Sequence, residues 1–181
     1  MPFLEPDKYF SRISHIDVQR DLLSCGLRCV LLDIDNTILA RDTRTVPRDA
    51  ALWLAQARDA GVRFCLVSNS WQEDVFGIAE NLDLPIVVKS MKPLPQGYLM
   101  GMRRLGAKRR ETVMVGDQIA TDVLGAHLVG MKAYMVQPLV EQDLPHTLML
   151  RNVERVILGD RAPEPVTPAC EGILEAAARE L

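Results

Sequence analysis

The sequence predicts an α/β fold, a three-layer α/β/α sandwich with a mainly parallel, Rossmann-like sheet. Short apolar runs alternate with helical segments of about a dozen residues, and such alternation favours right-handed crossovers between parallel strands. The 181 residues are 48% hydrophobic and 25% charged, as in ordinary globular proteins. A chain of this length can bury a proper core within one domain. We therefore expect a single α/β unit.

The first 27 residues are expected to form an arm and a short helix that pack on the body of the domain. Phe3, Leu4 and Tyr9 make the beginning of the chain too apolar for a free tail. A helix is predicted over 17–24, because Asp17 is a good N-cap residue and Gly26 is a typical residue just past a helix end.

Strands and helices are predicted to alternate through the middle of the chain. The strands are apolar runs bounded by glycine, proline or charge, at residues 28–34, 62–67, 85–88, 112–115 and 131–136. The helices between them are predicted at residues 48–60, 73–82, 95–105 and 121–129. The first of these follows Pro47 and stops at Gly61, and this pairing of proline and glycine is typical of helix ends.

The C-terminal part has a weaker pattern. Residues 153–158 fit either a further strand or the end of a helix that begins near Leu144. Residues 160–181 combine a Pro-rich connector with a short Ala-rich helix that is predicted over 170–181. We predict one domain over 1–159 and an appended connector and helix over 160–181.

Composition narrows the classes of function. A formal charge of −3 argues against a general nucleic-acid binder. No apolar stretch approaches the roughly 20 residues of a membrane span, and the N-terminus lacks a basic region followed by an apolar one. We therefore expect a cytoplasmic protein. We also expect reduced thiols instead of a zinc site, because no cysteine pair has the close double spacing that such a site needs. The cysteines are Cys25, Cys29, Cys65 and Cys170.

Polar side chains gather where the predicted strands end or the following helices begin. In chain order they are Asp33, Asp35, Asn36 and Thr37, then Ser68 and Asn69, then Lys92, and finally Asp117 and Asp122. The carboxyl ends of parallel strands open on one edge of a sheet, so these groups are expected to form one site. Each piece alone is common in turns and helix caps. Their joint order is what indicates a site.

This set of residues suits metal-assisted phosphoryl chemistry. Asp33, Asp117 and Asp122 supply hard oxygen ligands of the kind that Mg²⁺ prefers. A carboxylate beside Mg²⁺ and facing a phosphate can act as a nucleophile, and Asp33 is the natural choice. Asp35, two residues on, can give a proton to the leaving oxygen and later take one from water.

Donors for the phosphate oxygens are expected close to the same acids. Ser68, Lys92 and the backbone N–H groups near Asn69 and Asn36 have suitable chemistry, and Thr37 is counted with them. Lys92 also offsets the repulsion between an attacking carboxylate and an anionic phosphate.

The four groups of residues resemble the four motifs of the haloacid dehalogenase (HAD) superfamily. They are Asp33-Ile-Asp35-Asn-Thr37, Ser68-Asn69, Lys92-Pro93, and Gly116-Asp117 with Thr121-Asp122. The resemblance covers roughly residues 28–136, and all four motifs occur in the right order on the right elements. The Asn-Thr pair is similar to subfamily IIIA phosphatases of the YqeG type, which include mitochondrial phosphatidylglycerophosphatases. The N-terminal Phe3-Leu4-x-Pro6-Asp7-x-Tyr9 fits that family too.

The resemblance implies a role for each acid. Asp33 would form an aspartyl-phosphate, and Asp35 would act as acid and base while its backbone carbonyl ligates Mg²⁺. Asp117 would ligate the metal. Asp122 would either reach the metal through water or position Lys92. Members of this superfamily order their strands 5-4-1-2-3, and we adopt that order as an expectation.

The spacing of the motifs indicates an open site. Superfamily members often carry a cap domain after the first motif or between the second and third, and neither gap here is long enough to hold one. An open site suits a bulky or surface-bound phosphomonoester, or a pocket completed by a partner subunit in a homo-oligomer. Arg41, Arg44 and Arg48 follow the first motif, so their loop is a candidate for binding an anionic head group. With the aromatic arm, it would let the enzyme work at a membrane surface.

The leading hypothesis is thus a Mg²⁺-dependent phosphatase, with phosphatidylglycerophosphate as the substrate that the resemblance suggests. One alternative keeps the chemistry and takes a soluble metabolite or a phosphoprotein as substrate. A second is a phospho-accepting, receiver-like signalling domain, although receivers normally lack an acid two residues after the acceptor. A third is a metal-binding scaffold without activity.

Overall fold

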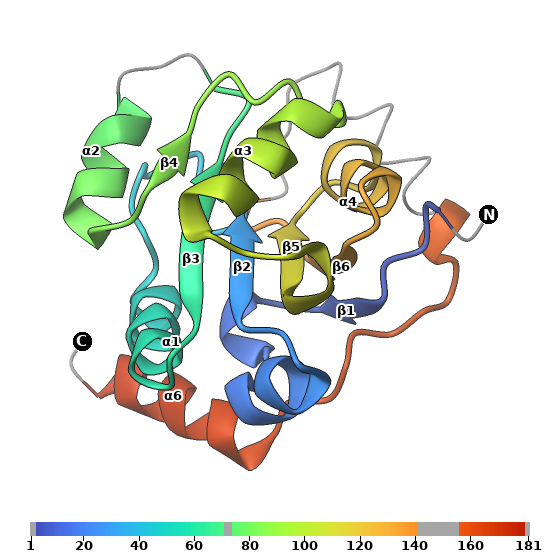
Figure 1. Ribbon diagram of the computed structural model, residues 1–181. Helices are drawn as coiled ribbons and strands as arrows, with labels where there is room; N and C mark the ends of the chain where they lie inside the picture. Colours follow the sequence, from blue (N-terminus) through green and yellow to red (C-terminus); the bar gives the residue numbers. More distant parts are fainter. Residues whose placement is uncertain (1–2, 71–73, 141–155, 180–181) are drawn as a thin grey trace.

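The protein contains one six-stranded sheet in which each strand runs parallel to its neighbours (Figure 1). The computed structural model describes residues 3–70, 74–140 and 156–179. The strands are β1 (Lys8–Phe10), β2 (Cys29–Leu32), β3 (Arg63–Val67), β4 (Ile86–Val87), β5 (Thr112–Gly116) and β6 (Lys132–Val136). Their spatial order is β1-β6-β5-β2-β3-β4.

The predicted fold class is confirmed, and the strand order differs by one addition. The five predicted strands are β2 to β6, and they lie in the expected order 5-4-1-2-3. The structure adds β1 at the sheet edge, where Tyr9 is in register with Met135 of β6. The sequence predicts only a packed arm for this segment. Three residues are too few to show a strand period, and the pairing joins segments far apart in the chain.

The helices agree well with the predicted segments. They are α1 (Arg48–Asp59), α2 (Asp74–Leu82), α3 (Pro95–Leu105), α4 (Leu124–Leu128) and α6 (Pro168–Ala178). The segment predicted at 121–129 is divided, because a π-helical turn (Ile119–Val123) precedes α4. The segment predicted at 17–24 is likewise a π-helical turn, η2 (Val18–Leu22), followed by a 3-10 turn (Leu23–Cys25). Asp17 caps it by accepting hydrogen bonds from two backbone N–H groups.

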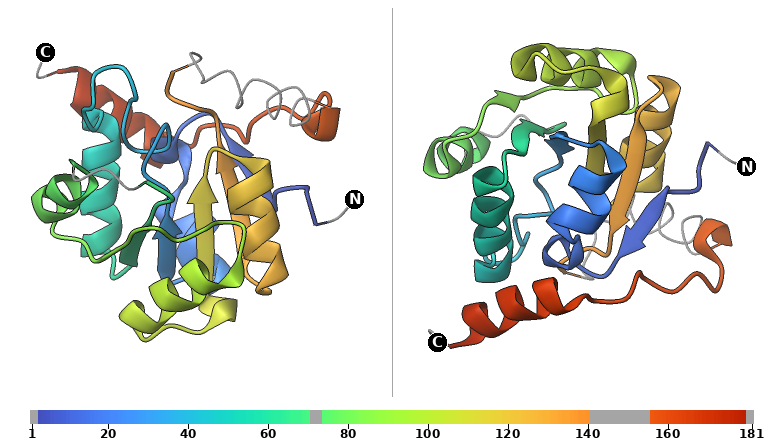
Figure 2. Two further views of the ribbon diagram at one scale, coloured as in Figure 1. Left: turned by 90° about the horizontal axis from the view of Figure 1, so that it is seen from above. Right: turned by 60° about the horizontal axis from the view of Figure 1, so that its bottom comes forward.

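Helices cover both faces of the sheet (Figures 1 and 2). One apolar cluster joins the sheet to α1, α2, α6 and the N-terminal turns, and the other joins it to α3 and α4. Trp53 of α1 is fully buried in the first cluster. Its ring packs edge to face against that of Phe64, with the two ring centroids 5.6 Å apart. Its Nε1 donates a hydrogen bond to the backbone oxygen of Ile16 at 2.7 Å. Trp53 is therefore a packing residue of this cluster.

The N-terminal arm is bound to the body by polar contacts as well as by β1. The side chain of His127 lies 2.9 Å from the backbone oxygen of Phe3 and 3.1 Å from Asp7 Oδ2. Asp7 Oδ2 also accepts from the backbone N–H of Ala133 at the start of β6. These contacts show why residues this close to the N-terminus pack on the domain.

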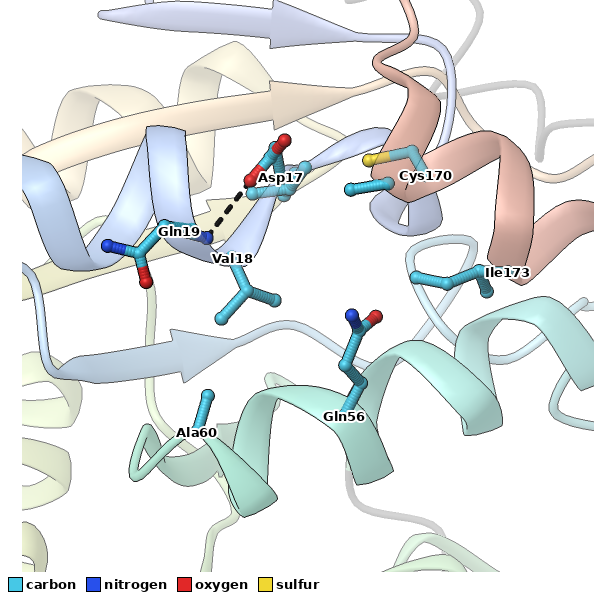
Figure 3. Close-up of a pocket in the computed structure, with 9 residues that line it drawn as sticks. Asp17, Val18, Gln19, Gln56, Ala60, Cys170 and Ile173 are labelled. Carbon is cyan, nitrogen blue, oxygen red and sulfur yellow. Dashed lines mark hydrogen bonds between the residues drawn. The ribbon is translucent and has the colours of Figure 1, made fainter.

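The C-terminal helix α6 packs against α1 and the N-terminal turns. Ile173 and Cys170 of α6 are buried there, and the three elements enclose a pocket of about 190 Å³ (Figure 3). The helix begins at Pro168, with Thr167 as its N-cap, two residues before the predicted start. Of the segment predicted at 153–158, residues 153–155 lie outside the described residues, and residues 156–158 are helical.

Two expectations from composition can be compared with the structure. Cys25, Cys29, Cys65 and Cys170 are all free thiols, and only the first of them is exposed. Among the described residues, no helix has both the length and the apolar character needed to cross a membrane.

Candidate active site

A small pocket opens at the carboxyl edge of the sheet, where β2, β3 and β5 end. Its volume is about 80 Å³. It is lined by Asp33, Asp35, Arg41, Ser68, Asn69, Ser70, Lys92, Gln118 and Thr121. Residues from all four sequence motifs therefore line one cavity, as expected for strand ends that share one edge.

Three acids are buried together at this edge. Asp33, Asp117 and Asp122 are each at least 93% buried, and each contributes a carboxylate oxygen to a group whose members lie within 4.8 Å of one another. Three carboxylates at this distance repel one another strongly in a poorly solvated site. The cluster therefore needs nearby positive charge.

Lys92 supplies one positive charge. Its Nζ lies 2.5 Å from Asp33 Oδ1 and 2.7 Å from Asp122 Oδ1. Burial by itself lowers the pKa of Lys92, but the carboxylates of Asp122 and Asp33 more than offset this effect and raise it above its ordinary value. Lys92 is therefore a permanent cation in this cluster.

A single lysine does not balance the cluster. The pKa of Asp33 is raised to about 8. Burial is the main cause of the rise, the carboxylates of Asp122 and Asp117 add to it, and Lys92 opposes it. An acid with a pKa this high carries a proton at neutral pH unless further positive charge arrives. Hard carboxylate oxygens at this spacing suit a divalent cation, which would supply that charge. The donor set thus fits a metal ion held by Asp33 and Asp117.

The loop that carries Lys92 is held by the side chain of Asn69. Asn69 Oδ1 accepts from the backbone N–H of Lys92 at 2.7 Å and from Ser90 Oγ at 2.8 Å, while Asn69 Nδ2 donates to the backbone oxygen of Lys92 at 3.1 Å. Lys89 and Met91, on either side of Ser90, have φ angles of 50° and 53°. Non-glycine residues adopt this region at a cost, so the surroundings must impose the loop shape.

Asn69 was predicted to help bind phosphate, and the structure shows a different use for its side chain. Its amide makes these three contacts with the loop that carries Lys92. A phosphate contact from the backbone near Asn69 stays a prediction. Ser68, next to it, is buried in the pocket wall, and its Oγ accepts from the backbone N–H of Ser70 at 2.9 Å.

Asp35 lies at the more exposed side of the pocket. Its side chain is 26% exposed, and its Oδ1 accepts from Arg44 Nη1 at 2.9 Å. Arg44 belongs to a tight turn in which its backbone N–H donates to the oxygen of Ala40, and its φ angle is 53°. The contact between Arg44 and Asp35 was not predicted, since nothing in the spacing of two residues nine apart in a loop indicates it.

Asn36 and Thr37 shape the turn after β2. The backbone N–H of Asn36 donates to the oxygen of Leu39 at 2.8 Å, and its side-chain Nδ2 donates to the oxygen of Val140 at 3.2 Å. Asn36 has a φ angle of 62°, a conformation that asparagine tolerates better than most residues. Both residues are buried. The predicted phosphate contacts of Asn36 and Thr37 stay untested expectations.

Asp122 is held between Lys92 and the turn after β5. While its Oδ1 contacts Lys92, its Oδ2 accepts from the backbone N–H of Gln118 at 3.1 Å. A Cβ atom on Gly116 would lie 2.2 Å from this oxygen, so the glycine makes room for the carboxylate. Of the two roles left open for Asp122, this geometry favours positioning Lys92.

The structure adds Tyr98 of α3 to the surroundings of the site. The side chain is fully buried, and its hydroxyl donates to the backbone oxygen of Thr121 at 2.5 Å. Burial, with the carboxylate of Asp122, raises the pKa of this phenol above its ordinary value. Nothing in the sequence distinguishes Tyr98 from a core aromatic residue, and only the packing of α3 on the Asp122 turn reveals it.

Comparisons with known proteins agree with this geometry. The family described as haloacid dehalogenase-like hydrolase matches residues 8–130. The probable phosphatase YqeG of Bacillus subtilis is 30% identical over 156 residues, which cover 86% of this chain and 90% of that protein.

Two further matches are shorter or more distant. The phosphoserine phosphatase of Thermus thermophilus is 31% identical over 107 residues, which cover 53% of this chain and 43% of that protein. A solved structure of an uncharacterized protein from Corynebacterium glutamicum shares the fold, with a TM-score of 0.53 and 19% identity over 77% of this chain and 100% of that chain.

Proposed function

The chain is a phosphatase of the haloacid dehalogenase-like hydrolase family, and we propose that it hydrolyses phosphomonoesters with Mg²⁺ through an aspartyl-phosphate. The observation that carries the proposal is the contact of Lys92 Nζ with Asp33 Oδ1 at 2.5 Å, in a pocket that also contains Asp35. A buried carboxylate beside a lysine, with two further acids behind it, has the chemistry of a phosphoryl acceptor.

The first half of the proposed reaction transfers the phosphoryl group to the protein. A carboxylate oxygen of Asp33 forms a bond to phosphorus while the bond from phosphorus to the leaving oxygen breaks. Lys92 and Ser68 hold the phosphoryl oxygens, and Asp35 donates a proton to the leaving oxygen. Bound Mg²⁺, held by Asp33, Asp117 and the backbone oxygen of Asp35, would supply positive charge that lets the acid and the phosphate approach.

The second half returns the enzyme to its starting state. Asp35, now unprotonated, takes a proton from a water molecule that attacks phosphorus. The bond between phosphorus and Asp33 then breaks, which releases inorganic phosphate and restores the carboxylate. Asp122 takes no part in the proton transfers and keeps Lys92 directed at Asp33.

For the physiological substrate we propose phosphatidylglycerophosphate. Two large apolar side chains near Lys92 support a lipid interface, because Met91 is 55% exposed and Leu94 is 49% exposed. Exposed apolar groups beside a catalytic pocket suit a site that meets the surface of a bilayer. We propose in addition that residues 1–159 form the phosphatase domain and 160–181 an appendage to it.

Phosphate release from a panel of lipid and soluble monoesters tests the proposal. We expect activity with Mg²⁺, loss of activity with a chelator, and loss in Asp33→Asn. In Asp35→Asn, turnover should stop while phosphate binding persists. A preference for a sugar phosphate or a nucleotide would overturn the lipid assignment, and stable phosphorylation of Asp35→Asn with no hydrolysis in the wild type would favour a receiver.

A further inference from the structure

We propose that Arg41 selects phosphomonoesters whose leaving group carries a second anionic group. The proposal rests on the proposed function, because it concerns the leaving-group side of the same pocket. It names a class of substrate by its charge: a phosphodiester, a carboxylate or a second phosphate a few bonds from the leaving oxygen. Phosphatidylglycerophosphate in a membrane and several soluble metabolites share this chemistry.

Arg41 lies in a turn of defined shape. The backbone N–H of Ala40 donates to the oxygen of Thr45 at 3.1 Å, and that of Arg44 donates to the oxygen of Ala40 at 2.9 Å. The hydroxyl groups of Thr43 and Thr45 lie 2.8 Å apart. These contacts close the segment from Ala40 to Thr45, so Arg41 extends from an ordered turn.

The turn is bound to the residue that would protonate the leaving oxygen. Arg44 Nη1 contacts Asp35 Oδ1 at 2.9 Å, and Arg41 lines the same pocket as Asp35. An acid that donates a proton to the leaving oxygen must lie beside that oxygen. The turn therefore lies on the side of the pocket where the leaving group would bind.

The two cationic residues of the pocket, Lys92 and Arg41, have different surroundings. Among the described residues that line it, Lys92 and Arg41 are the cationic ones. Lys92 is 6% exposed and is bound to Asp33 and Asp122, so its charge serves the transferred phosphoryl group. Arg41 is half-buried at the rim. A guanidinium group there matches the planar, two-oxygen geometry of a phosphate or carboxylate.

A matched pair of soluble substrates tests the selection. Terminally phosphorylated glycerol and phosphoglycerate differ at the far carbon, where the first has a neutral hydroxymethyl group and the second a carboxylate. We expect the wild type to prefer phosphoglycerate by about tenfold in kcat/KM, the effect of one partly exposed charged hydrogen bond. Phosphatidylglycerophosphate in vesicles forms a third arm, which separates recognition of the anion from recognition of a membrane.

Three variants assign the preference to Arg41. In Arg41→Gln the ratio of the two kcat/KM values should fall to near one, and in Arg41→Lys it should be intermediate because the charge stays but the planar fork is lost. Arg110→Gln is the matched control, since Arg110 is exposed, lies just before β5 at the end of that strand away from the pocket, and does not line the pocket. The wild-type ratio should persist in this control. Thermal unfolding of each variant checks that the fold is intact.

Each contrary result has a distinct meaning. An unchanged ratio in Arg41→Gln, or an equal loss on both substrates, would overturn the role of Arg41. A wild type that hydrolyses both soluble esters equally, or a preference confined to the lipid, would also overturn it while the phosphatase assignment stands. Absence of hydrolysis of all three esters with Mg²⁺ would overturn the proposed function itself.

Discussion

Two clusters of buried charge in this protein have opposite balances. At the carboxyl edge of the sheet, one lysine faces three buried acids. Beside β1, the acid Asp21 is fully buried and contacts two cations. Its Oδ1 lies 2.6 Å from Lys8 Nζ and 2.8 Å from Arg20 Nε. Asp21 Oδ2 also accepts from the backbone N–H of Asp17 at 2.9 Å.

The pKa values follow this difference. Burial alone would raise the pKa of Asp21, yet hydrogen bonds from Arg20 and Lys8 bring it below its ordinary value. Burial and the neighbouring carboxylates raise the pKa of Asp33 to about 8, because the opposing effect of Lys92 is smaller than theirs. A buried acid with enough partners within the chain stabilises the fold. A buried acid with too few partners within the chain is a candidate for binding a ligand, and this distinguishes the first cluster from the second.

The largest expected effect comes from replacing Asp33, the acid that has too little positive charge around it. Asp33→Asn should lower kcat by about 10⁴-fold or more, because it removes the proposed nucleophile. The same change should raise the free energy of unfolding by about 1–4 kcal/mol at neutral pH without divalent cations, since it removes an acid that must take up a proton when the protein folds. Phosphate release and urea unfolding measure the two effects. Residual turnover near the wild-type rate would disprove the covalent role.

Removing Lys92 should have the opposite effect on stability. Lys92→Gln leaves Asp33 and Asp122 without the cation that contacts both, so the free energy of unfolding should fall by about 3–5 kcal/mol in the presence of a chelator. Added Mg²⁺ should recover part of the loss. Lys132→Gln, at an exposed position at the start of β6, should stay within about 0.5 kcal/mol of the wild type. Equal effects of the two variants would contradict the proposed charge balance.

In the cluster around Asp21, loss of the acid should affect the stability of the fold and not the activity. Asp21→Asn should lower the free energy of unfolding by about 1–3 kcal/mol, because Lys8 and Arg20 lose a shared partner and are themselves partly exposed. Its phosphatase activity should stay close to that of the wild type below the unfolding temperature. Asp59→Asn, at an exposed position at the end of α1, is the control. A stabilised Asp21→Asn variant would contradict the comparison.

The two acids should also differ in pH dependence. The folded-state pKa of Asp33 lies above its ordinary value of 3.8, so without divalent cations its contribution to stability decreases as pH rises from 3.8 toward 8. The folded-state pKa of Asp21 lies below 3.8, so its stabilising contribution is present above 3.8 and is lost as pH falls through the folded-state pKa.

Urea unfolding across this pH range separates the two acids. Each should contribute a slope of up to about 1.4 kcal/mol per pH unit within its own window. Asp33→Asn should flatten the curve between pH 4 and 8, whereas Asp21→Asn should change it only at the acid end. Identical curves for the two variants would show that the clusters do not differ in charge balance.

Much of the architecture could be predicted from the sequence because it depends on local patterns. The apolar runs of β2, β3 and β5 and the helix ends at Pro47 and Gly106 are visible over a few residues. The four motifs could be assigned to one edge because strands in a parallel sheet end on the same side. The edge strand β1 escaped prediction because its three residues gain their strand character only by pairing with β6.

By itself, the sequence determined which residues meet at the candidate site, since carboxylates, a serine and a lysine at successive ends of parallel strands share one edge of the sheet. The tertiary structure decided how those residues share charge and support. It assigned the Asn69 amide to the Lys92 loop, joined Arg44 to Asp35, and left three acids with one lysine. Such balances depend on distances of a few ångströms between segments far apart in the chain, and Coulomb energies in a buried site change steeply over that range.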